Sequence, residues 1–479
     1  MDELQPLLNV AIALGYAFLL YVGWIVFQIV RPRFDPNLRN LRNIPGPFLS
    51  AYTGIPLKLA ILAGRRSVYI HALHEKYVGP YVRIAPHEVA IADIRAYRVI
   101  HRIGSDFNKG PWYAKQVPSQ QNDETSGVFG ILNNKVASRR RRLFQAAGGK
   151  NIVAEWEPQV IELAALAWWT FLASDVTGSL AFGEPFGNLK NGKKSEMVHD
   201  IEAAMPIIGV RAEFPWTKPI LDRLPTWLGN TWSARFKRFE KYGWDAVRAT
   251  RAAQAGGSRT LFSRMVLEEE KDQVIPDEII VREAANVIVA GTDTTAMTLT
   301  YLTYAVLKDE LIRKRLVAEL KKSSAEPTWD ELENLKYLNN VIQETMRLHP
   351  GIPGSLGRVV PASGARFEKY FLPAGTQVAT QAWTFQRDPD VFEEPLRFDP
   401  DRWDNSTPAM KEHMMAFGAP ARICLGQNIA RLELLHAVSK LFRDCPQIML
   451  APSTTDESME MVDYFAIKPK AAKCLVVPS

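Results

Sequence analysis

One short segment near the C-terminus limits the possible folds and chemistries of this 479-residue chain more than any other. It runs from Phe417 to Gly426 and places Cys424 between a glycine-containing turn and the start of a predicted helix, with Arg422 two residues before it. Backbone N–H groups at a helix N-terminus and a nearby guanidinium both favour a thiolate over a thiol. Because an anionic sulfur suits a soft metal such as iron, the segment indicates a metal-ligating cysteine. A buried structural cysteine is the alternative.

The composition excludes several other classes of protein. The three cysteines, Cys424, Cys445 and Cys474, are too few for a disulfide framework, and without a C-x-x-C pair they form no zinc ribbon and no covalent c-type haem site. With 47% hydrophobic and 23% charged residues, the chain is globular rather than disordered or fibrous. A net charge of +6, from 58 basic and 52 acidic residues, is too small to indicate nucleic-acid binding.

The N-terminus has the pattern of a membrane anchor. Residues 7–30 are almost wholly apolar, which is enough to cross a bilayer as a helix. Acids precede this run and arginines follow it, so we expect an uncleaved single-pass anchor over residues 1–30 with the rest of the chain in the cytosol. A cleaved signal peptide or a buried helix is the alternative. Residues 31–47 form a basic hinge that ends in Ile44-Pro45-Gly46-Pro47, a stiff bend that cannot continue a helix.

The remaining residues, 48–479, are expected to form one mostly helical domain with small sheets. Apolar residues recur at helical spacing over residues 276–307, 311–320, 332–348 and 426–442. Residues 82–91 predict two short strands around a turn.

Three groups of polar residues could carry chemistry. The segment from Ala290 to Thr295 places a glycine beside three threonines and Asp293, which is poor helix material. Its threonines could bond back to their own helix or open its hydrogen bonds. Glu344 and Arg347 share one helix face. In the run Arg139–Arg142 at least two side chains must face solvent, because successive helical residues turn by about 100°.

In this order along the chain, these segments resemble the cytochrome P-450 family of haem-thiolate monooxygenases. The cysteine loop of that family has the pattern F-x-x-G-x-R-x-C-x-G, which Phe417, Arg422, Cys424 and Gly426 match, whereas Pro420 stands where the pattern has glycine. The resemblance extends over nearly the whole chain. It implies a cytochrome P-450-like fold that is mainly α with small β-sheets, as a single large domain behind the N-terminal transmembrane helix.

The resemblance implies a set of cofactor contacts. Cys424 would be the axial thiolate ligand of the iron of haem b, in a loop formed with Phe417, Arg422 and Gly426. Two further arginines, Arg141 and Arg358, would contact the haem propionates. Ala137 stands where the family has an aromatic residue or His four positions before the first of these arginines.

Two other sites follow from the same resemblance. Gly291 would leave room beside the iron, while Asp293 and Thr294 would relay protons through water to bound O₂. Phe398–Trp403 resembles the aromatic-Pro-Arg segment of the family. It would supply the third member of a buried, structural charge triad, made of Glu344, Arg347 and Arg402.

The implied function is that of a membrane-anchored monooxygenase acting on a hydrophobic small molecule. Electrons from NADPH would come through a separate NADPH-cytochrome P-450 reductase, because no glycine-rich dinucleotide fingerprint follows a strand here. Asp175–Gly183 resembles the fungal secondary-metabolism branch, and the implied location is the endoplasmic reticulum membrane. By resemblance, the substrate pocket would be lined by the region after Ser105, residues 201–214, the long helix, residues 352–356 and Tyr464-Phe465.

Two other functions stay open at the level of sequence. The first is a haem-thiolate isomerase or dehydratase, although such relatives tend to lose the Asp–Thr pair. The second is a haem-poor binding or scaffold protein. It would be favoured by Pro420, by Ala137 and by the stretch between Arg142 and Trp168, which looks about four or five helical turns short for the family.

Overall fold

The computed structural model describes residues 15–16, 18–24, 26–27, 30, 40–116, 122–164, 169–214, 231–256, 260–263 and 276–478. The predicted anchor over residues 1–30 and the basic flank that follows it lie mostly outside these ranges. Among the described residues, no helix is both long enough and apolar enough to span a bilayer.

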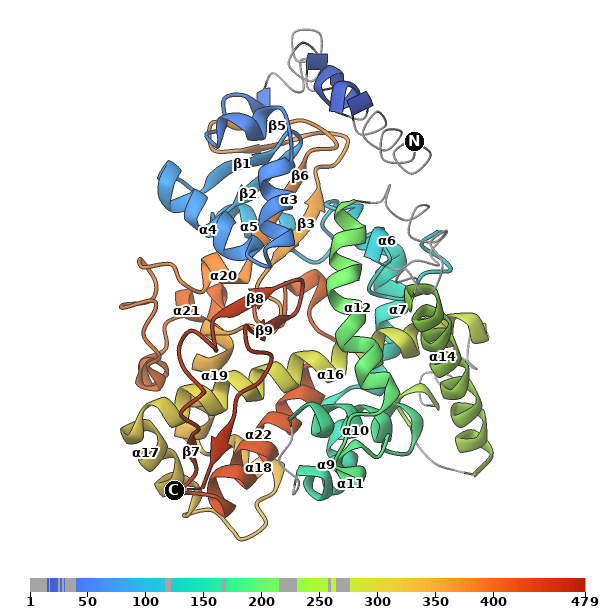
Figure 1. The fold of residues 1–479 in the computed structure, drawn as a ribbon, viewed down its shortest axis with the longest axis vertical. Helices are drawn as coiled ribbons and strands as arrows, with labels where there is room; N and C mark the ends of the chain where they lie inside the picture. The colour runs from blue at the N-terminus through green and yellow to red at the C-terminus, as the bar shows by residue number, and fades with distance from the viewer. Residues whose placement is uncertain are drawn as a thin grey trace, which may run out of the picture.

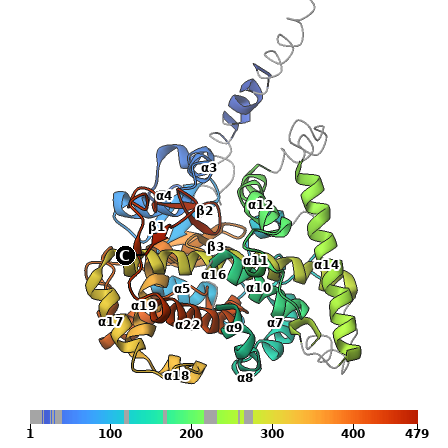
Figure 2. The same cartoon turned by 60° about the horizontal axis from the view of Figure 1, so that its bottom comes forward.

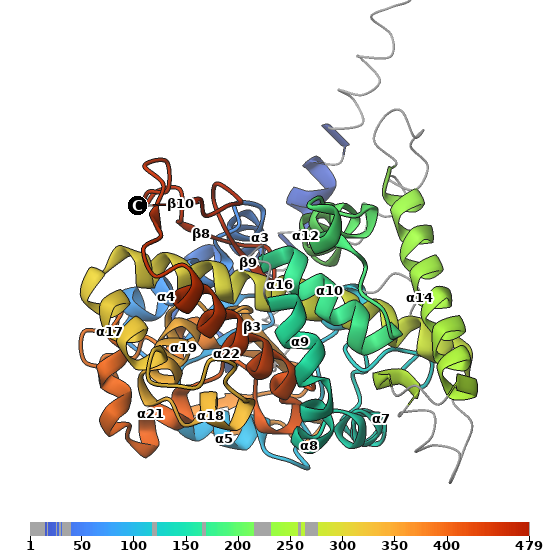
Figure 3. The same cartoon turned by 90° about the horizontal axis from the view of Figure 1, so that it is seen from below.

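A 32-residue helix, α16 (Asp277–Lys308), is the central element of the helical part. Pro276 precedes it, Asp277 and Glu278 lie in its first turn and Lys308 lies in its last, so the charges oppose the helix dipole at both ends. Figures 1, 2 and 3 show α10 (Trp169–Phe182) and α14 (Thr231–Gly256) beside α16 toward one of its ends and α19 (Lys336–Leu348) toward the other. The largest apolar core forms where these helices meet α22 (Gln427–Asp444).

The predicted helix over residues 332–348 is two helices in the structure. A capping box between Thr328 and Glu331 begins α18 (Trp329–Glu333), and α19 begins only at Lys336. The carboxylate of Glu319, on α17 (Glu310–Leu320), accepts hydrogen bonds from the backbone N–H groups of Tyr337 and Leu338 at 2.9 and 2.8 Å. The cap of α19 therefore comes from another helix, which local periodicity does not reveal.

The other helices are short or lie around this core. In chain order they are η2 (Phe48–Ala51), α3 (Ile55–Leu62), α4 (Arg66–Tyr77), α5 (Ile94–His101), α6 (Trp112–Gln116), α7 (Asn134–Ala147), α8 (Lys150–Val153), η3 (Ala154–Trp156), α9 (Glu157–Ala164), α11 (Asn188–Asn191), α12 (Glu196–Glu213), α20 (Ala382–Phe385), η6 (Pro400–Asn405), α21 (Pro408–His413) and η7 (Pro420–Arg422).

A four-stranded sheet lies at the N-terminal side of the body, beside α3, α4 and α5 (Figure 1). Its strand order is β1 (Tyr81–Ala85), β2 (Glu88–Ile91), β6 (Gln377–Gln381) and β3 (Ser355–Val359). The β1–β2 and β3–β6 pairs are antiparallel, and the β2–β6 pair is parallel. Three two-stranded sheets complete the fold: β4 (Ala365–Phe367) with β5 (Tyr370–Leu372), β7 (Met449–Leu450) with β10 (Val476–Val477), and β8 (Met461–Asp463) with β9 (Ile467–Pro469).

The proline-rich end of the predicted hinge packs on this sheet. The backbone N–H of Arg83, on β1, donates to the carbonyl of Pro45 at 2.7 Å. Leu41 and Ile44 are buried in the apolar core beneath the sheet. The packed body therefore extends toward the N-terminus as far as Leu41.

Candidate active site

A cavity of about 720 Å³ lies between the middle of α16 and the cysteine loop that precedes α22. Its walls include all five regions that the sequence predicted. They contribute Lys109–Tyr113, Ala212, Glu213, several residues of α16, Ile352, Leu356, Tyr464 and Phe465. Cys424, Phe417, Arg422 and Gly426 line the same cavity, so the structure brings the predicted cofactor loop and the predicted substrate walls together.

The cysteine loop accommodates its proline without strain. Gly418 has φ +87°, so the left-handed residue of the loop is this glycine rather than residue 420. Pro420 is the first residue of η7, a position where no backbone N–H is needed. The loop is closed by a hydrogen bond from the Cys424 N–H to the Phe417 carbonyl at 2.7 Å and one from the Arg422 N–H to the Ala419 carbonyl at 2.8 Å.

The electrostatic environment of Cys424 differs from the one expected. Burial raises the pKa of the Cys424 thiol, while a hydrogen bond from the Gly426 N–H and the charge of Arg141 act in the opposite direction. The guanidinium that faces the sulfur is thus that of Arg141, and the expectation that Arg422 would act on the thiol is wrong. Burial outweighs both favourable contacts, so the net shift of the pKa is upward, whereas a coordinating metal would deprotonate the thiol.

Arg422 instead ties the cysteine loop to the segment before α7. Its Nε and Nη2 atoms donate to Asn134 Oδ1 at 3.2 and 3.0 Å, and Nη2 also donates to the carbonyls of Leu132 and Asn133 at 3.2 Å each. Its Nη1 atom is buried without a hydrogen-bond partner among the described residues. Burial, followed by the charges of Arg358 and Arg141, lowers the pKa of Arg422 to about 9.

The two predicted propionate ligands also line the cavity. Arg141, on α7, donates from Nη2 to the Ile423 carbonyl at 2.5 Å, beside the cysteine. Arg358, on β3, is 3% exposed and donates from Nη1 to the carbonyl of the adjacent Gly357 at 2.9 Å. Ala137 is fully buried, so its methyl group supplies no donor. In the same arginine run, Arg139 and Arg142 are exposed, as expected.

Opposite the cysteine, α16 continues as a helix through Ala290–Thr295. The Thr294 hydroxyl donates to the Ala290 carbonyl at 2.7 Å, and the Thr298 hydroxyl donates to the Thr294 carbonyl at 2.9 Å. Gly291 lines the cavity, but a Cβ atom at this residue would lie 2.5 Å from Thr177 Oγ1 on α10. The absence of a side chain is therefore needed for close packing of α10, and space beside a cofactor, which the resemblance implied, stays a prediction.

Asp293 faces the cavity from the same helix. Burial raises the pKa of its carboxyl to about 7, and the negative charge of Glu202 on α12 adds to this effect, while Lys468 and Lys194 oppose it. A carboxyl with this pKa both holds and releases a proton near neutral pH. Its position beside Thr294 agrees with the acid–alcohol pair that the sequence predicted.

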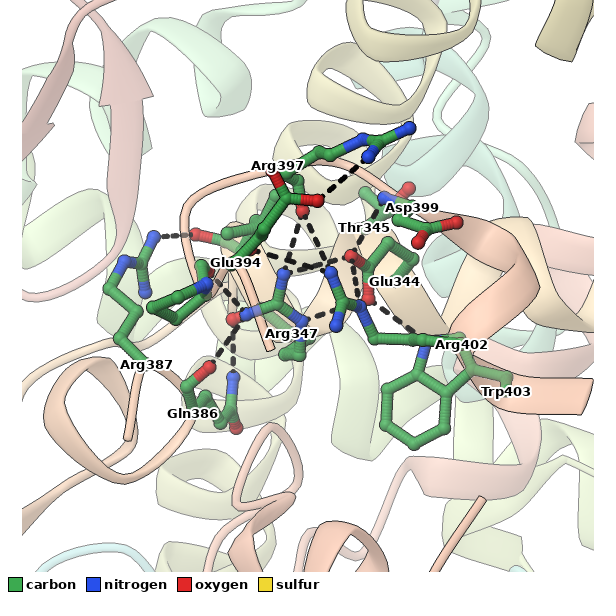
Figure 4. A network of polar contacts seen from close by, with 12 residues as sticks. Glu344, Thr345, Arg347, Gln386, Arg387, Glu394, Arg397, Asp399, Arg402 and Trp403 are labelled. Atoms are coloured by element: carbon green, nitrogen blue, oxygen red, sulfur yellow. Dashed lines mark hydrogen bonds and ion pairs between the residues drawn. The ribbon is translucent and has the colours of Figure 1, made fainter. Parts of the chain in front are cut away.

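The predicted charge triad forms as expected (Figure 4). Glu344 and Arg347, on α19, have fully buried side chains, and the Arg347 Nε and Nη2 atoms each donate to the Glu344 carboxylate at 2.8 Å. Arg402 Nε donates to the same carboxylate at 3.0 Å. Sequence reasoning missed two further donors, the Trp403 indole at 2.9 Å and the Asp399 N–H at 2.9 Å.

The triad is connected to the cysteine loop through Gln386. Arg347 Nη1 donates to the Gln386 carbonyl at 2.8 Å, and Gln386 Oε1 accepts from the Met415 N–H at 2.8 Å. The Met415 carbonyl in turn accepts from Gly418 N–H at 2.8 Å, inside the loop. This chain of contacts explains how a buried ion pair can fix the loop that carries Cys424.

The structure reveals further buried ionisable residues that line the cavity and that sequence reasoning missed, among them Lys109, Glu283 and Glu433. Lys109 lies among the arginines described above. Glu283, on α16, accepts from the Val128 N–H at 2.8 Å, and its pKa is raised to about 7, chiefly by burial. Glu433, on α22, is 2% exposed, and burial raises its pKa well above the usual value. Each is a single ionisable residue in an otherwise ordinary helix or loop, so no motif marks it.

The donor set of this cavity fits a haem. A cysteine sulfur faces the cavity from one side, α16 bounds the other, and the guanidinium groups of Arg141, Arg358 and Arg422, which bond to no carboxylate among the described residues, face the same space. A porphyrin with two carboxylates would supply the anions that these cations lack.

Comparisons with known proteins agree with this arrangement. The family model described as Cytochrome P450 matches residues 45–476. The chain is 34% identical over 461 residues to "Cytochrome P450 monooxygenase tazI" of Aspergillus terreus, and the matched region covers 91% of this chain and 93% of that protein. It is 32% identical over 496 residues to "Cytochrome P450 monooxygenase aflV" of Aspergillus parasiticus, covering 97% of each.

A solved structure shows the same fold. The structure titled "Retinoic acid bound cyanobacterial CYP120A1" superposes with a TM-score of 0.67 and 19% identity, over 84% of this chain and 93% of that one. At this identity the likeness concerns the fold alone.

Proposed function

The chain belongs to the cytochrome P450 family, and we propose that it is a membrane-anchored haem-thiolate monooxygenase of fungal secondary metabolism, inserting one oxygen atom of O₂ into a hydrophobic small molecule. One observation carries the proposal. Cys424 faces the same cavity as Asp293 and Thr294, and buried arginines flank the cysteine side. The named fungal relatives, all monooxygenases, support the reaction class.

The haem, when bound, supplies the iron at which O₂ is activated. The residues of the chain hold the cofactor and control protons. Asp293 can pass a proton near pH 7, since its pKa is about 7. The Thr294 hydroxyl, which now bonds to the Ala290 carbonyl, has to rotate before it can donate into the cavity.

The cavity favours a substrate that is apolar over most of its surface. The wall formed by α16 includes Val287, Val289 and Ala290, and the far side includes Trp112 and Phe465 in ring contact, with centroids 5.6 Å apart. Charged side chains also line the cavity. Among them, Arg66 pairs with Glu88 at 3.0 Å and with Glu213 at 3.2 Å. Because Arg66 binds both carboxylates, this cluster does not call for a charged substrate.

Electron supply and location are part of the same proposal. NADPH-cytochrome P-450 reductase is the proposed donor, because the sequence carries no dinucleotide fingerprint of its own. The apolar run over residues 7–30 and the arginines after it support anchoring in the endoplasmic reticulum membrane with the catalytic domain in the cytosol. The Asp293–Thr294 pair favours oxygen insertion over an isomerase or dehydratase, and the fit of Pro420 at η7 weakens the case for a haem-poor scaffold.

The test is the reduced, carbon-monoxide difference spectrum of the purified chain and of three variants. A strongly red-shifted Soret band is expected for the native protein and for Cys445→Ala, which removes a cysteine at the far end of α22. The band should be absent from Cys424→Ala. Thr294→Ala should keep the band but form less product per NADPH consumed. An active Cys424→Ala enzyme, or native protein without haem, would refute the proposal.

A further inference from the structure

A cluster of three charged residues lines the cavity from elements that do not carry the cysteine loop. Arg66, the first residue of α4, donates from Nη2 to Glu88 Oε1 on β2 at 3.0 Å and from Nη1 to Glu213 Oε1 on α12 at 3.2 Å. We call these three residues the Arg66 cluster. Figures 1 and 2 show α12 and α22 on opposite sides of α16, so the cluster and the loop before α22 face the cavity from different sides.

The Arg66 cluster keeps unused hydrogen-bonding capacity. The side chains of Arg66, Glu88 and Glu213 are 15, 17 and 12% exposed. Their mutual bonds use one oxygen of each carboxylate, and among the described residues the Oε2 atom of each glutamate accepts no hydrogen bond. A guanidinium has more N–H donors than these two bonds use, and Arg66 Nε has no partner within the described part of the chain. The cluster therefore offers both donors and acceptors to a ligand.

The surroundings of the cluster make these unused groups important for ligand choice. The walls of the cavity also include apolar side chains such as Ile61, Ala212 and Phe465. Burial raises the pKa of Glu88, and the charge of Glu213 adds to this effect, although the charge of Arg66 opposes it. A wholly apolar ligand that filled the cavity would leave the free carboxylate oxygens without donors. A site of this kind rejects an analogue that lacks the matching polar group, because its own polar groups are then left unpaired.

The charges near the cluster indicate that this polar group is neutral. Lys58, on α3, also lines the cavity and donates from Nζ to the Glu213 carbonyl at 2.8 Å. Asp463 lines it too, but its carboxylate already accepts from the N–H groups of Ser67 and Phe465 at 3.2 Å each. An added carboxylate would therefore face the two glutamates of the cluster, and an added ammonium would face the two cations. A hydroxyl both donates and accepts, so it matches this mixed set.

We propose that the Arg66 cluster is a substrate subsite that binds a hydroxyl group of an otherwise apolar substrate. The hydroxyl donates to Glu88 Oε2 and accepts from the Arg66 guanidinium. Glu88 is the acceptor, because the pairing of β2 with β6 fixes its backbone, while Glu213 holds Arg66 in place from α12. The inference rests on the proposed function, since it takes this cavity as the substrate site of the monooxygenase, and it names the class of substrate.

The experiment compares ligands of one shape by isothermal titration calorimetry of the ferric holoenzyme. The probes are para-phenylphenol, para-methoxybiphenyl, biphenyl, biphenyl-para-carboxylate and para-phenylbenzylamine. We expect the native enzyme to bind para-phenylphenol about 10-fold more tightly than each of the others, as for one hydrogen bond to a charged group. The methoxy compound can accept but not donate, so its comparison with the phenol isolates the bond to the glutamate. A phenol that binds no more tightly than biphenyl would overturn the proposal.

A variant then assigns the preference to Glu88. In Glu88→Gln the amide oxygen can keep the bond to Arg66, while the free acceptor becomes an N–H donor. The preference for the phenol over the methoxy compound should fall to within about twofold. Glu412→Gln is the matched control, because Glu412 pairs with Arg98 outside the cavity, and it should keep the native preference.

The outcomes separate this inference from the function on which it rests. A native preference that persists in Glu88→Gln would overturn the subsite and would leave the cluster a structural ion pair. Should Glu88→Gln not accumulate as holoenzyme, Glu88→Asp, which withdraws the same acceptor by one methylene group, takes its place in the comparison. A native protein that binds no haem would refute the proposed function instead.

Discussion

The sharpest test of the fold concerns the single carboxylate at the centre of the charge triad. Glu344→Gln keeps the shape of this fully buried side chain but removes its charge and turns one oxygen into a donor. In the native protein Oε1 accepts from Arg347, Arg402 and the Asp399 N–H, and Oε2 accepts from Arg347 and Trp403. Whichever way the amide is placed, its NH₂ group faces at least two donors.

The expected cost follows from what remains buried. Arg347, with a fully buried side chain, and Arg402 would keep their positive charges without the carboxylate between them. Removing one partner of a buried ion pair costs about 3–5 kcal/mol. This cost changes the equilibrium constant for local opening by about 140- to 3,700-fold, because each 1.4 kcal/mol is tenfold.

Hydrogen exchange of the native holoenzyme and of each variant measures this opening in residues 393–405. The matched control is Glu394→Gln, because Glu394 and Arg397 form an ion pair of the same spacing at 2.7 Å with both side chains 62% exposed. Exchange in Glu394→Gln should change by less than about fivefold. Equal protection loss in the two variants would refute the view that the buried carboxylate is what holds this segment.

Three further predictions concern the cavity. Gly291→Ala should lower the thermal midpoint, because its Cβ would lie 2.5 Å from Thr177 Oγ1, and Thr177→Ala in the same chain should restore part of the loss. Folding keeps the Asp293 carboxyl protonated up to about pH 7, whereas in the unfolded chain it ionises near pH 4, so this group makes the folded state less stable as pH rises between these values. Asp293→Asn should therefore gain stability over the native enzyme across that interval in urea titrations, and an equal difference at pH 4 and pH 8 would contradict the assignment. Glu433→Gln should cost less than about 1.5 kcal/mol, because burial keeps this acid neutral and an amide matches it, and a loss in urea titrations as large as that of Glu344→Gln would show that it is ionised.

Features encoded in contiguous residues were predictable from the sequence. The loop from Phe417 to Gly426 contains its own turn, cysteine and helix start, and the structure closes it by a hydrogen bond within the segment. The long helix carries its charged ends and its apolar spacing in the chain itself. The triad was predictable for a different reason, because the resemblance supplied the pairing of Arg402 with residues about 60 positions earlier.

Features that depend on a distant partner were not predictable in this way. The break before α19 arises from Glu319 on another helix, and the guanidinium beside Cys424 is Arg141, from about 280 residues earlier, rather than the adjacent Arg422. No sequence motif marks Lys109, and its position opposite Arg358 follows only from its pairing with β3. The packing role of Gly291 was not predictable, because its close neighbour, Thr177, lies on α10.

The arginines of the charge triad and those of the cavity differ in how far the protein itself satisfies their hydrogen bonds. In the triad, Arg347 is satisfied entirely from within, by Glu344 and by the carbonyls of Gln386, Pro395 and Arg397 at 2.7–3.0 Å. At the cavity, Arg358 bonds to its own neighbour, and Arg422 keeps a buried nitrogen without a partner among the described residues. Repulsion among the cavity cations therefore opposes folding of this wall until an anion binds. Because a ligand that binds only the folded state stabilises it, haem binding and formation of this wall are thermodynamically linked.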